Sequence, residues 1–346
     1  MLKEFFQKKL LMQDYNMFNK QLYNTKYHDI DLSNYSFLVT GGAGFIGSNL
    51  VEYLLRYNAG KVRVLDNLSN GYFENIKSFI EFKNFEFVEG DIRDYETCKK
   101  ALIGIDFVSH QAALGSVPRS ISDPITSNEV NISGFLNILH AAKDSSELKR
   151  LVFAASSSTY GDSTILPKIE GNEGNPLSPY AVTKLVNELY ADVFSKVYGF
   201  HTIGLRYFNI FGPKQNPKNP YAAVIPIFCQ CFLDNIEPKI NGDGETSRDF
   251  TFVENAVQAN IKALLSKKLE KFEVFNVACG DQISLNEMIK TLKKISNKEL
   301  NATYGPERSG DVRHSKASIV KLVDFCGYEP KVKFEEGLQI VYNWYK

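Results

Sequence analysis

A glycine-rich turn near the start of the chain restricts the possible folds more than any other feature. Residues 40–47 read Thr-Gly-Gly-Ala-Gly-Phe-Ile-Gly and lie between an apolar run, 37–39, and a helix-like stretch, 48–57. Glycines at this spacing permit a tight strand-to-helix turn and a close approach of the backbone to a phosphate group. The unpaired N–H groups at the start of such a helix favour an anion. The pattern therefore predicts a strand–turn–helix unit that binds a pyrophosphate.

Acidic residues after the next two apolar runs indicate which dinucleotide would bind. Asp66 follows the run 62–65, and its carboxylate can accept hydrogen bonds from the adenosine ribose while repelling a 2′-phosphate. NAD is therefore favoured over NADP. The alternative reading of Asp66 is a turn residue within 66–71. Asp91 and Ile92 follow the run 85–88 and could flank the adenine, although Asp91 could equally cap the following helix.

Short apolar runs continue to alternate with helix-like stretches as far as residue 212. Further runs occur at 106–110, 151–155 and 202–207, with helical patterns such as 133–143 and 181–197 between them. This alternation predicts an α/β fold, a Rossmann-type doubly wound parallel sheet, followed by a smaller C-terminal substrate-binding α/β domain. We expect a helical N-terminal extension over 1–34, an NAD-binding domain over 35–212 with segments returning from the C-terminal half, and a substrate domain over 213–346.

Composition excludes several classes of function. The 346 residues carry equal numbers of acidic and basic side chains, so nucleic acid is not an expected partner. The five cysteines are scattered and show no zinc spacing, which favours free thiols in a reducing cytoplasm and no metal site. No apolar run is long enough to span a bilayer, and the first residues lack an apolar signal core, so we expect neither a membrane partner nor a leader.

A tyrosine and a lysine four residues apart suggest acid–base chemistry. Tyr180 and Lys184 would share one face of a helix, downstream of Ser156 at the end of an apolar run. A nearby cation lowers the pKa of a phenol, so Tyr180 could accept a proton from a substrate hydroxyl. The alternative is that the pair merely decorates a solvated helix.

Taken together and in order, these motifs resemble the extended short-chain dehydrogenase/reductases of the nucleotide-sugar epimerase and dehydratase group. The resemblance runs from about residue 35 to 346 and also includes 91–94, 110–113, 156–161 and 206–209. It implies a catalytic set of Ser156, Tyr180 and Lys184. It further implies that NAD is held by Gly41, Gly44, Phe45, Ile46, Gly47, Asp66, Asn67, Ser69, Asn70, Gly71, Asp91, Ile92, Gln111, Tyr180, Lys184 and Tyr207.

Within that family, the chain looks like an epimerase that acts on a UDP-sugar. Dehydratases carry an Asp-Glu pair after the catalytic threonine, whereas this chain has Ser157 and Ser158. The resemblance therefore implies oxidation and re-reduction at C4 of a UDP-hexose. The implied substrate contacts are Ser116, Ser156, Ser157, Ser158, Asn209, Ala223, Val224, Arg248, Arg308, Asp311 and Ser315. The alternative for Arg248 is a surface ion pair with Asp249.

Three positions bear on which sugar is bound. Ser315 aligns with a gatekeeper that is a bulky tyrosine in galactose-type epimerases, and a small residue leaves room for a 2-acetamido group. Ser116 and Ser120 are candidate contacts to that group, or else ordinary loop hydroxyls. The chain is most similar to bacterial UDP-N-acetylglucosamine 4-epimerases.

Several alternatives stay open at this point. Plain hexose or uronic-acid substrates, a net nucleotide-sugar oxidoreductase, and a catalytically idle NAD-binding protein all remain possible. The resemblance also implies a cytoplasmic homodimer.

Overall fold

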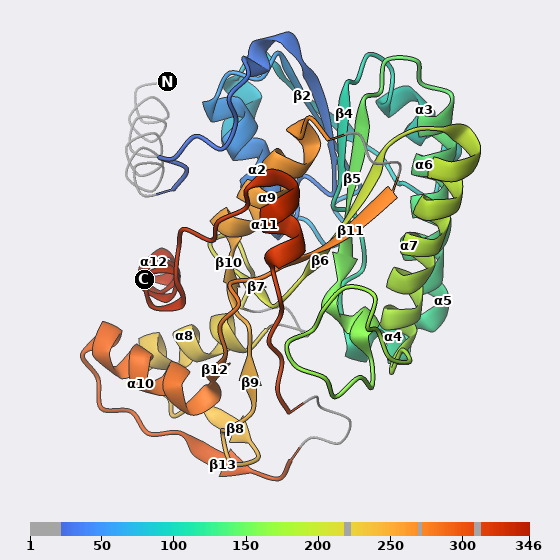
Figure 1. Ribbon diagram of the computed structural model, residues 1–346. Coiled ribbons are helices and arrows are strands. Elements are labelled where there is room, and N and C mark those ends of the chain that lie inside the picture. The colour runs from blue at the N-terminus through green and yellow to red at the C-terminus, as the bar shows by residue number, and fades with distance from the viewer. Residues whose placement is uncertain (1–21, 218–222, 269–271, 308–312) are drawn as a thin grey trace, which may run out of the picture.

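Seven parallel strands form the centre of the molecule (Figure 1). The computed structural model describes residues 22–217, 223–268, 272–307 and 313–346. The sheet has the order β11-β6-β5-β4-β1-β2-β3. Its strands are β1 (Ser36–Thr40), β2 (Lys61–Asp66), β3 (Phe85–Glu89), β4 (Phe107–His110), β5 (Arg150–Ser156), β6 (Thr202–Tyr207) and β11 (Phe272–Val277). The predicted Rossmann-type sheet is confirmed, and β11 is a segment that returns from the C-terminal half.

Alternating side chains along each strand feed two apolar cores, one on each face of the sheet. In β1, Phe37 and Val39 belong to one core and Leu38 to the other, as the two-residue period of a strand requires. The first core contains side chains of α2 (Phe45–Arg56) and α9 (Val253–Leu265). The second contains side chains of α3 (Tyr95–Ala101), α6 (Phe135–Lys143) and α7 (Pro179–Tyr198).

A smaller part of the chain lies beyond one end of the sheet (Figure 1). Its longer helices are α8 (Val224–Asp234), α10 (Leu285–Ser296) and α12 (Phe334–Tyr345). Its two-stranded pairings are β7 (Ile210–Phe211) with β10 (Thr251–Phe252), β8 (Lys239–Asn241) with β13 (Thr303–Gly305), and β9 (Ser247–Arg248) with β12 (Ile283–Ser284). Of the short helices, α4 (Val117–Ser122) and α5 (Pro124–Asn128) pack against α7 of the sheet domain, and α11 (Val320–Cys326) packs against β11.

Two predicted helix boundaries differ from the structure. The helix predicted over 48–57 already begins at Phe45, because the last glycine of the turn lies inside its first turn. The helix predicted over 133–143 is preceded by a π-helical segment, Glu129–Gly134, which joins α5 to α6. The helix expected near the N-terminus falls on residues 1–21, outside the described residues.

The strand order reverses between β1 and β4. The chain runs outward from β1 through β2 to β3, and then returns to the other side of β1 for β4, β5 and β6. The loops that follow β1 and β4 therefore diverge from neighbouring strand ends at one edge of the sheet. Such a switch point leaves a crevice where ligands bind in doubly wound sheets.

Residues 22–34, here called the N-terminal segment, pack against α2 and α9. Leu22 and Tyr23 are buried within the first apolar core. In the part of the chain that the structure describes, no helix combines the length and the apolar character that crossing a membrane requires.

A buried arginine ties β6 to α7. Arg206 is 2% exposed, and its guanidinium donates to both carboxylate oxygens of Glu188, at 2.9 and 2.6 Å. It also pairs with Glu173 and lies 4.9 Å from the centre of the Tyr160 ring. The guanidinium charge is thus compensated by two carboxylates and by the face of one aromatic ring.

We expect Arg206→Met to lower the free energy of unfolding by about 3–5 kcal/mol, because it leaves the buried Glu188 carboxylate unpaired. Urea unfolding followed by circular dichroism measures this change. Lys196→Met is the matched control, since it breaks the exposed Lys196–Asp192 pair of the same helix and should cost far less. Equal effects of the two substitutions would contradict the role given to Arg206.

Candidate active site

The glycine turn leaves the start of α2 open to an anion. Gly41 has φ +67°, and a Cβ there would lie 2.6 Å from the backbone nitrogen of Ala112 in the loop after β4. A Cβ on Gly47 would lie 2.2 Å from the Gly41 carbonyl oxygen. The helix begins after Gly44, and no side chain caps its first N–H groups. These groups and the helix dipole therefore suit a pyrophosphate.

A cleft of about 330 Å³ lies in front of this turn. Most of the predicted cofactor residues line it, namely Gly41, Gly44, Phe45, Asp66, Asn67, Ser69, Asn70, Gly71, Asp91, Ile92 and Gln111. Ala223, predicted to contact substrate, lines the same cleft. Ile46 and Gly47 lie in the first turn of α2 rather than among the lining residues.

Asp66 holds two turns together at the end of β2. Its carboxylate accepts hydrogen bonds from the backbone nitrogens of Ala43 and Leu68, both at 2.9 Å. Burial raises the pKa of this carboxyl. A carboxylate oxygen can accept more than one hydrogen bond, so the turn contacts leave acceptor capacity toward the cleft. Asp66 can therefore act both as a turn residue and as an acceptor for the adenosine ribose hydroxyls.

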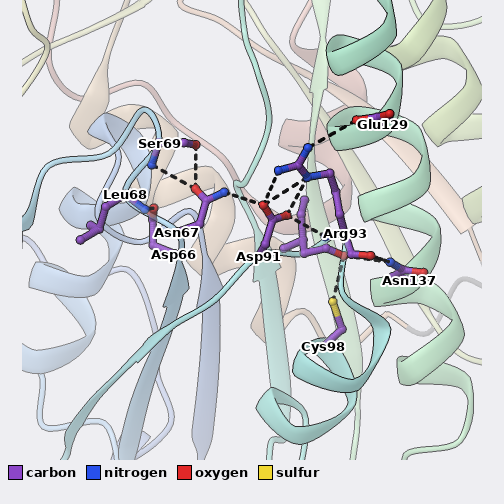
Figure 2. Close-up of polar contacts among 10 residues, drawn as sticks. Asp66, Asn67, Leu68, Ser69, Asp91, Arg93, Cys98, Glu129 and Asn137 are labelled. Atoms are coloured by element: carbon purple, nitrogen blue, oxygen red, sulfur yellow. Dashed lines mark hydrogen bonds and ion pairs between the residues drawn. The ribbon is translucent and has the colours of Figure 1, made fainter.

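Asp91 is oriented by its neighbours at the end of β3 (Figure 2). Its carboxylate accepts from Asn67 Nδ2 at 2.8 Å and from Arg93 Nη2 at 2.7 Å. The Arg93 hydrogen bond lowers the pKa of this carboxyl to about 2. Helix α3 is capped by Asp94, which accepts from Glu96 N and Thr97 N. The alternative that Asp91 caps this helix is therefore wrong.

Tyr180 lies in the first turn of α7, opposite Ser156 at the end of β5. The N-cap Ser178 accepts from Ala181 N at 3.1 Å, and the Tyr180 backbone nitrogen donates to Ser120 Oγ at 3.0 Å. A Cβ on Gly115 would lie 4.0 Å from the Tyr180 hydroxyl oxygen. The hydroxyl therefore faces the loop that leaves the cofactor cleft.

Lys184 is buried beneath this tyrosine. Its Nζ donates to the carbonyl oxygen of Ala154 at 2.8 Å and lies 6.0 Å from the centre of the Tyr180 ring. Burial lowers the pKa of Lys184 to about 8. It raises the pKa of Tyr180, while a hydrogen-bonding interaction with the Ser156 side chain acts in the opposite direction. The expectation that Lys184 sets a lowered tyrosine pKa is therefore wrong for this structure, because desolvation dominates.

Ser156, the last residue of β5, and Ser158 form a local hydrogen-bond network. Ser156 Oγ accepts from Ser158 N at 3.1 Å and from Ser158 Oγ at 2.9 Å. Ser157 begins the 3₁₀ turn Ser157–Tyr160 and is partly exposed. This network fixes the Ser156 hydroxyl at the carboxyl end of the sheet.

Two serines of the following loop have structural partners. Ser116 caps α4 by accepting from Arg119 N at 3.2 Å. Ser120 has no exposed surface, and its hydroxyl donates to Val117 O while accepting from Tyr180 N. The candidate role of Ser120 as a sugar contact is therefore wrong, and it instead holds the Tyr180 backbone.

The predicted nucleotide contacts lie in the smaller part of the chain. Arg248 Nη1 donates to Ser247 O at 3.0 Å and to Arg313 O at 3.3 Å, and Asn209 Nδ2 donates to Asp249 O at 3.3 Å. Val224 begins α8 and Ser315 is half-buried. Arg308 and Asp311 lie outside the described residues.

Asp249, the alternative partner of Arg248, is fully buried and has backbone partners. Its carboxylate accepts from the backbone nitrogens of Cys279, Gly280 and Ala317, at 2.9, 3.1 and 3.2 Å. Burial raises the pKa of this carboxyl to about 6. Asp249 therefore joins three segments on the substrate side.

Some residues at the cleft carry no sequence signal. Tyr207 donates to Gln111 Oε1 at 3.0 Å and accepts from Asn260 Nδ2 at 2.7 Å, so α9 supports the predicted pair. Lys214, Gln215 and Asn216 also line the cleft. Neither Asn260 nor these residues belongs to a motif. Within the described ranges, no group of His, Cys, Asp or Glu side chains forms a metal site.

Comparison with known proteins gives a consistent result. Residues 37–278 match the NAD dependent epimerase/dehydratase family. A putative UDP-glucose 4-epimerase of Methanocaldococcus jannaschii is 37% identical, over 89% of this chain and 98% of its own length.

Two solved structures share the fold over nearly their whole length. The UDP-N-acetylglucosamine 4-epimerase of Methanobrevibacter ruminantium, in complex with UDP-N-acetylmuramic acid, is 38% identical with a TM-score of 0.85, over 90% of this chain and 98% of that one. The UDP-glucuronic acid 4-epimerase of Bacillus cereus, with UDP-glucuronic acid and NAD, is 31% identical with a TM-score of 0.83, over 89% and 98%. With its pyrophosphate turn and parallel sheet, the chain belongs to the NAD dependent epimerase/dehydratase family, and its cofactor is NAD.

Proposed function

We propose that this protein is a UDP-hexose 4-epimerase that works through a transient 4-keto sugar. The observation that carries the proposal is the convergence of Ser156, Tyr180 and Lys184 beside the cleft of an NAD-dependent fold. The relatives reported above, which carry the names of 4-epimerases for three UDP-sugars, support it.

The chain's own residues divide the work at one carbon. Tyr180 takes the proton of the 4-hydroxyl and later returns it, while Ser156 hydrogen-bonds the 4-oxygen. The Lys184 ammonium, held by Ala154 O and 6.0 Å from the centre of the Tyr180 ring, favours the phenolate without offsetting the desolvation that raises the Tyr180 pKa, and it would reach the nicotinamide ribose. NAD supplies the hydride acceptor and donor. Because the hydride would return to C4, the cycle would consume no NAD, and its return to the opposite face would invert C4.

We infer that the preferred pair is UDP-N-acetylglucosamine and UDP-N-acetylgalactosamine. Ser315 is small and partly exposed, and Gly115 carries no side chain next to the Tyr180 hydroxyl. The small residue at 315 supports a site with room for a 2-acetamido group. UDP-glucose and UDP-glucuronic acid are the alternatives, because relatives named for these sugars are similarly close.

We also infer a homodimer formed through α7. This helix exposes Leu189, Val193 and Val197 at helical spacing, with exposed fractions of 58, 52 and 64%. Ile125 of α5 is 72% exposed, and α5 packs against α7. A second copy that covers this apolar surface would remove it from water.

Incubation with UDP-N-acetylglucosamine should give UDP-N-acetylgalactosamine without net NADH, as chromatography and absorbance measure. Tyr180→Phe should slow conversion by at least about 100-fold, because it removes the proton acceptor. Bound NAD and the circular dichroism spectrum should stay unchanged.

Two outcomes would contradict this assignment. Retained turnover in Tyr180→Phe would refute the base, and stoichiometric NADH accumulation would favour a net oxidoreductase. Faster conversion of UDP-glucose or UDP-glucuronic acid would instead show that the enzyme prefers that sugar to the acetamido sugar. Ser315→Tyr serves as the matched variant, since it should slow the acetamido sugar more than UDP-glucose.

The pH dependence should reflect both buried groups. Below pH 8 Lys184 is charged, and the phenolate fraction of Tyr180, whose pKa is raised, grows about tenfold per pH unit. Above about pH 8 the ammonium loses its proton as fast as phenolate forms, so the rate of epimerisation should level off. In Lys184→Arg, whose guanidinium stays charged, the rise should continue past this pH. A wild-type rate that keeps rising would count against the coupling.

The exposed apolar residues of α7 predict the mass of the protein in solution. Light scattering should report twice the mass of one chain, and Leu189→Glu combined with Val193→Glu should give a monomer. Lys290→Glu, at an exposed position of α10 in the smaller part of the chain, is the control and should leave the dimer intact. A monomeric wild type would refute the pairing.

A further inference from the structure

One lip of the cofactor cleft is held by contacts to α2 and to Tyr72. This cleft lip, residues 213–216, supplies Lys214, Gln215 and Asn216 to the lining. Lys214 Nζ pairs with Glu52 Oε2 of α2 at 2.7 Å. Asn216 Nδ2 donates to the hydroxyl of Tyr72, another lining residue, at 2.7 Å.

The first residue of the lip is bound by a buried amide on α2. Asn49 has no exposed surface, and its Nδ2 donates to Pro213 O at 3.1 Å and to Phe45 O at 2.9 Å. Phe45 also lines the cleft, at the start of the helix that faces the pyrophosphate. One side chain thus joins two walls of the cofactor site. With Nδ2 bound to two carbonyl oxygens, Oδ1 is left to accept from another donor.

The partner of that oxygen comes from the N-terminal segment. The Tyr23 hydroxyl donates to Asn49 Oδ1 at 2.6 Å. Tyr23 has no exposed surface and has φ +57°, a conformation unfavourable for a large side chain. It is held there because its backbone nitrogen donates to Glu254 Oε1 at 3.1 Å and its carbonyl oxygen accepts from Tyr57 Oη at 2.9 Å.

We propose that Tyr23 is a positioning residue that holds the cleft lip through Asn49, so that the N-terminal segment slows the release of NAD. The segment precedes residue 37, where the match to the family begins. The hydroxyl fixes the orientation of the Asn49 amide, and the amide fixes Pro213. Since Asn49 is fully buried, bulk water does not replace the hydroxyl when it is removed. The proposal depends on NAD as the cofactor but not on which sugar is epimerised.

The test is the exchange of bound NAD against isotopically labelled NAD, measured on the full chain without any sugar. We expect Tyr23→Phe to accelerate the exchange about fivefold to tenfold, the cost of one lost buried hydrogen bond. Asn24→Ala is the control. It removes an acceptor that takes a hydrogen bond from Arg56 Nη2 of α2 at 2.7 Å in the same segment but leaves the Glu254 carboxylate that holds Tyr23 unchanged, and it should exchange like the wild type. Thermal melting checks that both variants are folded.

A double-mutant cycle identifies the route. In an Asn49→Ala background, which itself should exchange faster, Tyr23→Phe should add no further acceleration. Wild-type exchange in Tyr23→Phe would overturn the proposal. So would equal acceleration in Asn24→Ala, because the effect would then come from docking of the segment as a whole. A wild-type protein that binds no NAD would refute the cofactor and this proposal together, whereas a failed sugar assay would leave the exchange result intact.

Discussion

The close approach of two loops at the switch point is the constraint on which the rest of the site depends. The loops after β1 and β4 meet where a Cβ on Gly41 would lie 2.6 Å from Ala112 N, so a side chain there would separate them. The first loop continues into the open start of α2. The second continues to Gly115, next to the Tyr180 hydroxyl. One backbone contact therefore sets the distance between the pyrophosphate turn and the proposed base.

Charged groups around the cleft fall into two kinds, and their partners decide the direction of each pKa shift. The first kind is buried and paired with backbone groups, and burial shifts each pKa in the direction that favours the neutral form, as for Lys184, Asp66 and Asp249. Asp91 is less buried and paired with Arg93, so its pKa falls. Burial of a charge costs stability, but the same low dielectric strengthens its action on a neighbouring group. The position of Lys184 under Tyr180 fits a charge retained for chemistry rather than for stability.

The sequence predicted what depends on local stereochemistry and periodicity. The strands follow from apolar runs, and the glycine turn follows from backbone conformations that other residues rarely adopt. The prediction of a lowered pKa for Tyr180 was wrong, because desolvation depends on everything packed around a residue and not on the spacing to Lys184. The prediction that Ser120 contacts the sugar was wrong, because the Ser120 hydroxyl accepts a hydrogen bond from the backbone nitrogen of Tyr180 in α7. Asn260 and the cleft lip could not be found, since tertiary packing alone brings Asn260 to Tyr207 and the lip to the cleft.

The N-terminal segment illustrates how an addition to a shared fold can become part of a site. An extension that only covered apolar surface would need no polar contacts. The N-terminal segment does cover apolar surface, since its Tyr27 ring stacks on the Tyr53 ring with centroids 5.5 Å apart. However, its polar groups are directed to α2 and α9, where Asn49 and Glu254 are buried. Helix α2 also begins at the glycine turn, and its first residue, Phe45, lines the cleft. Because a packed helix moves as a rigid unit, any shift that the segment imposes on α2 reaches the cleft. The segment and the cofactor site therefore share a structural element as well as a chain of hydrogen bonds.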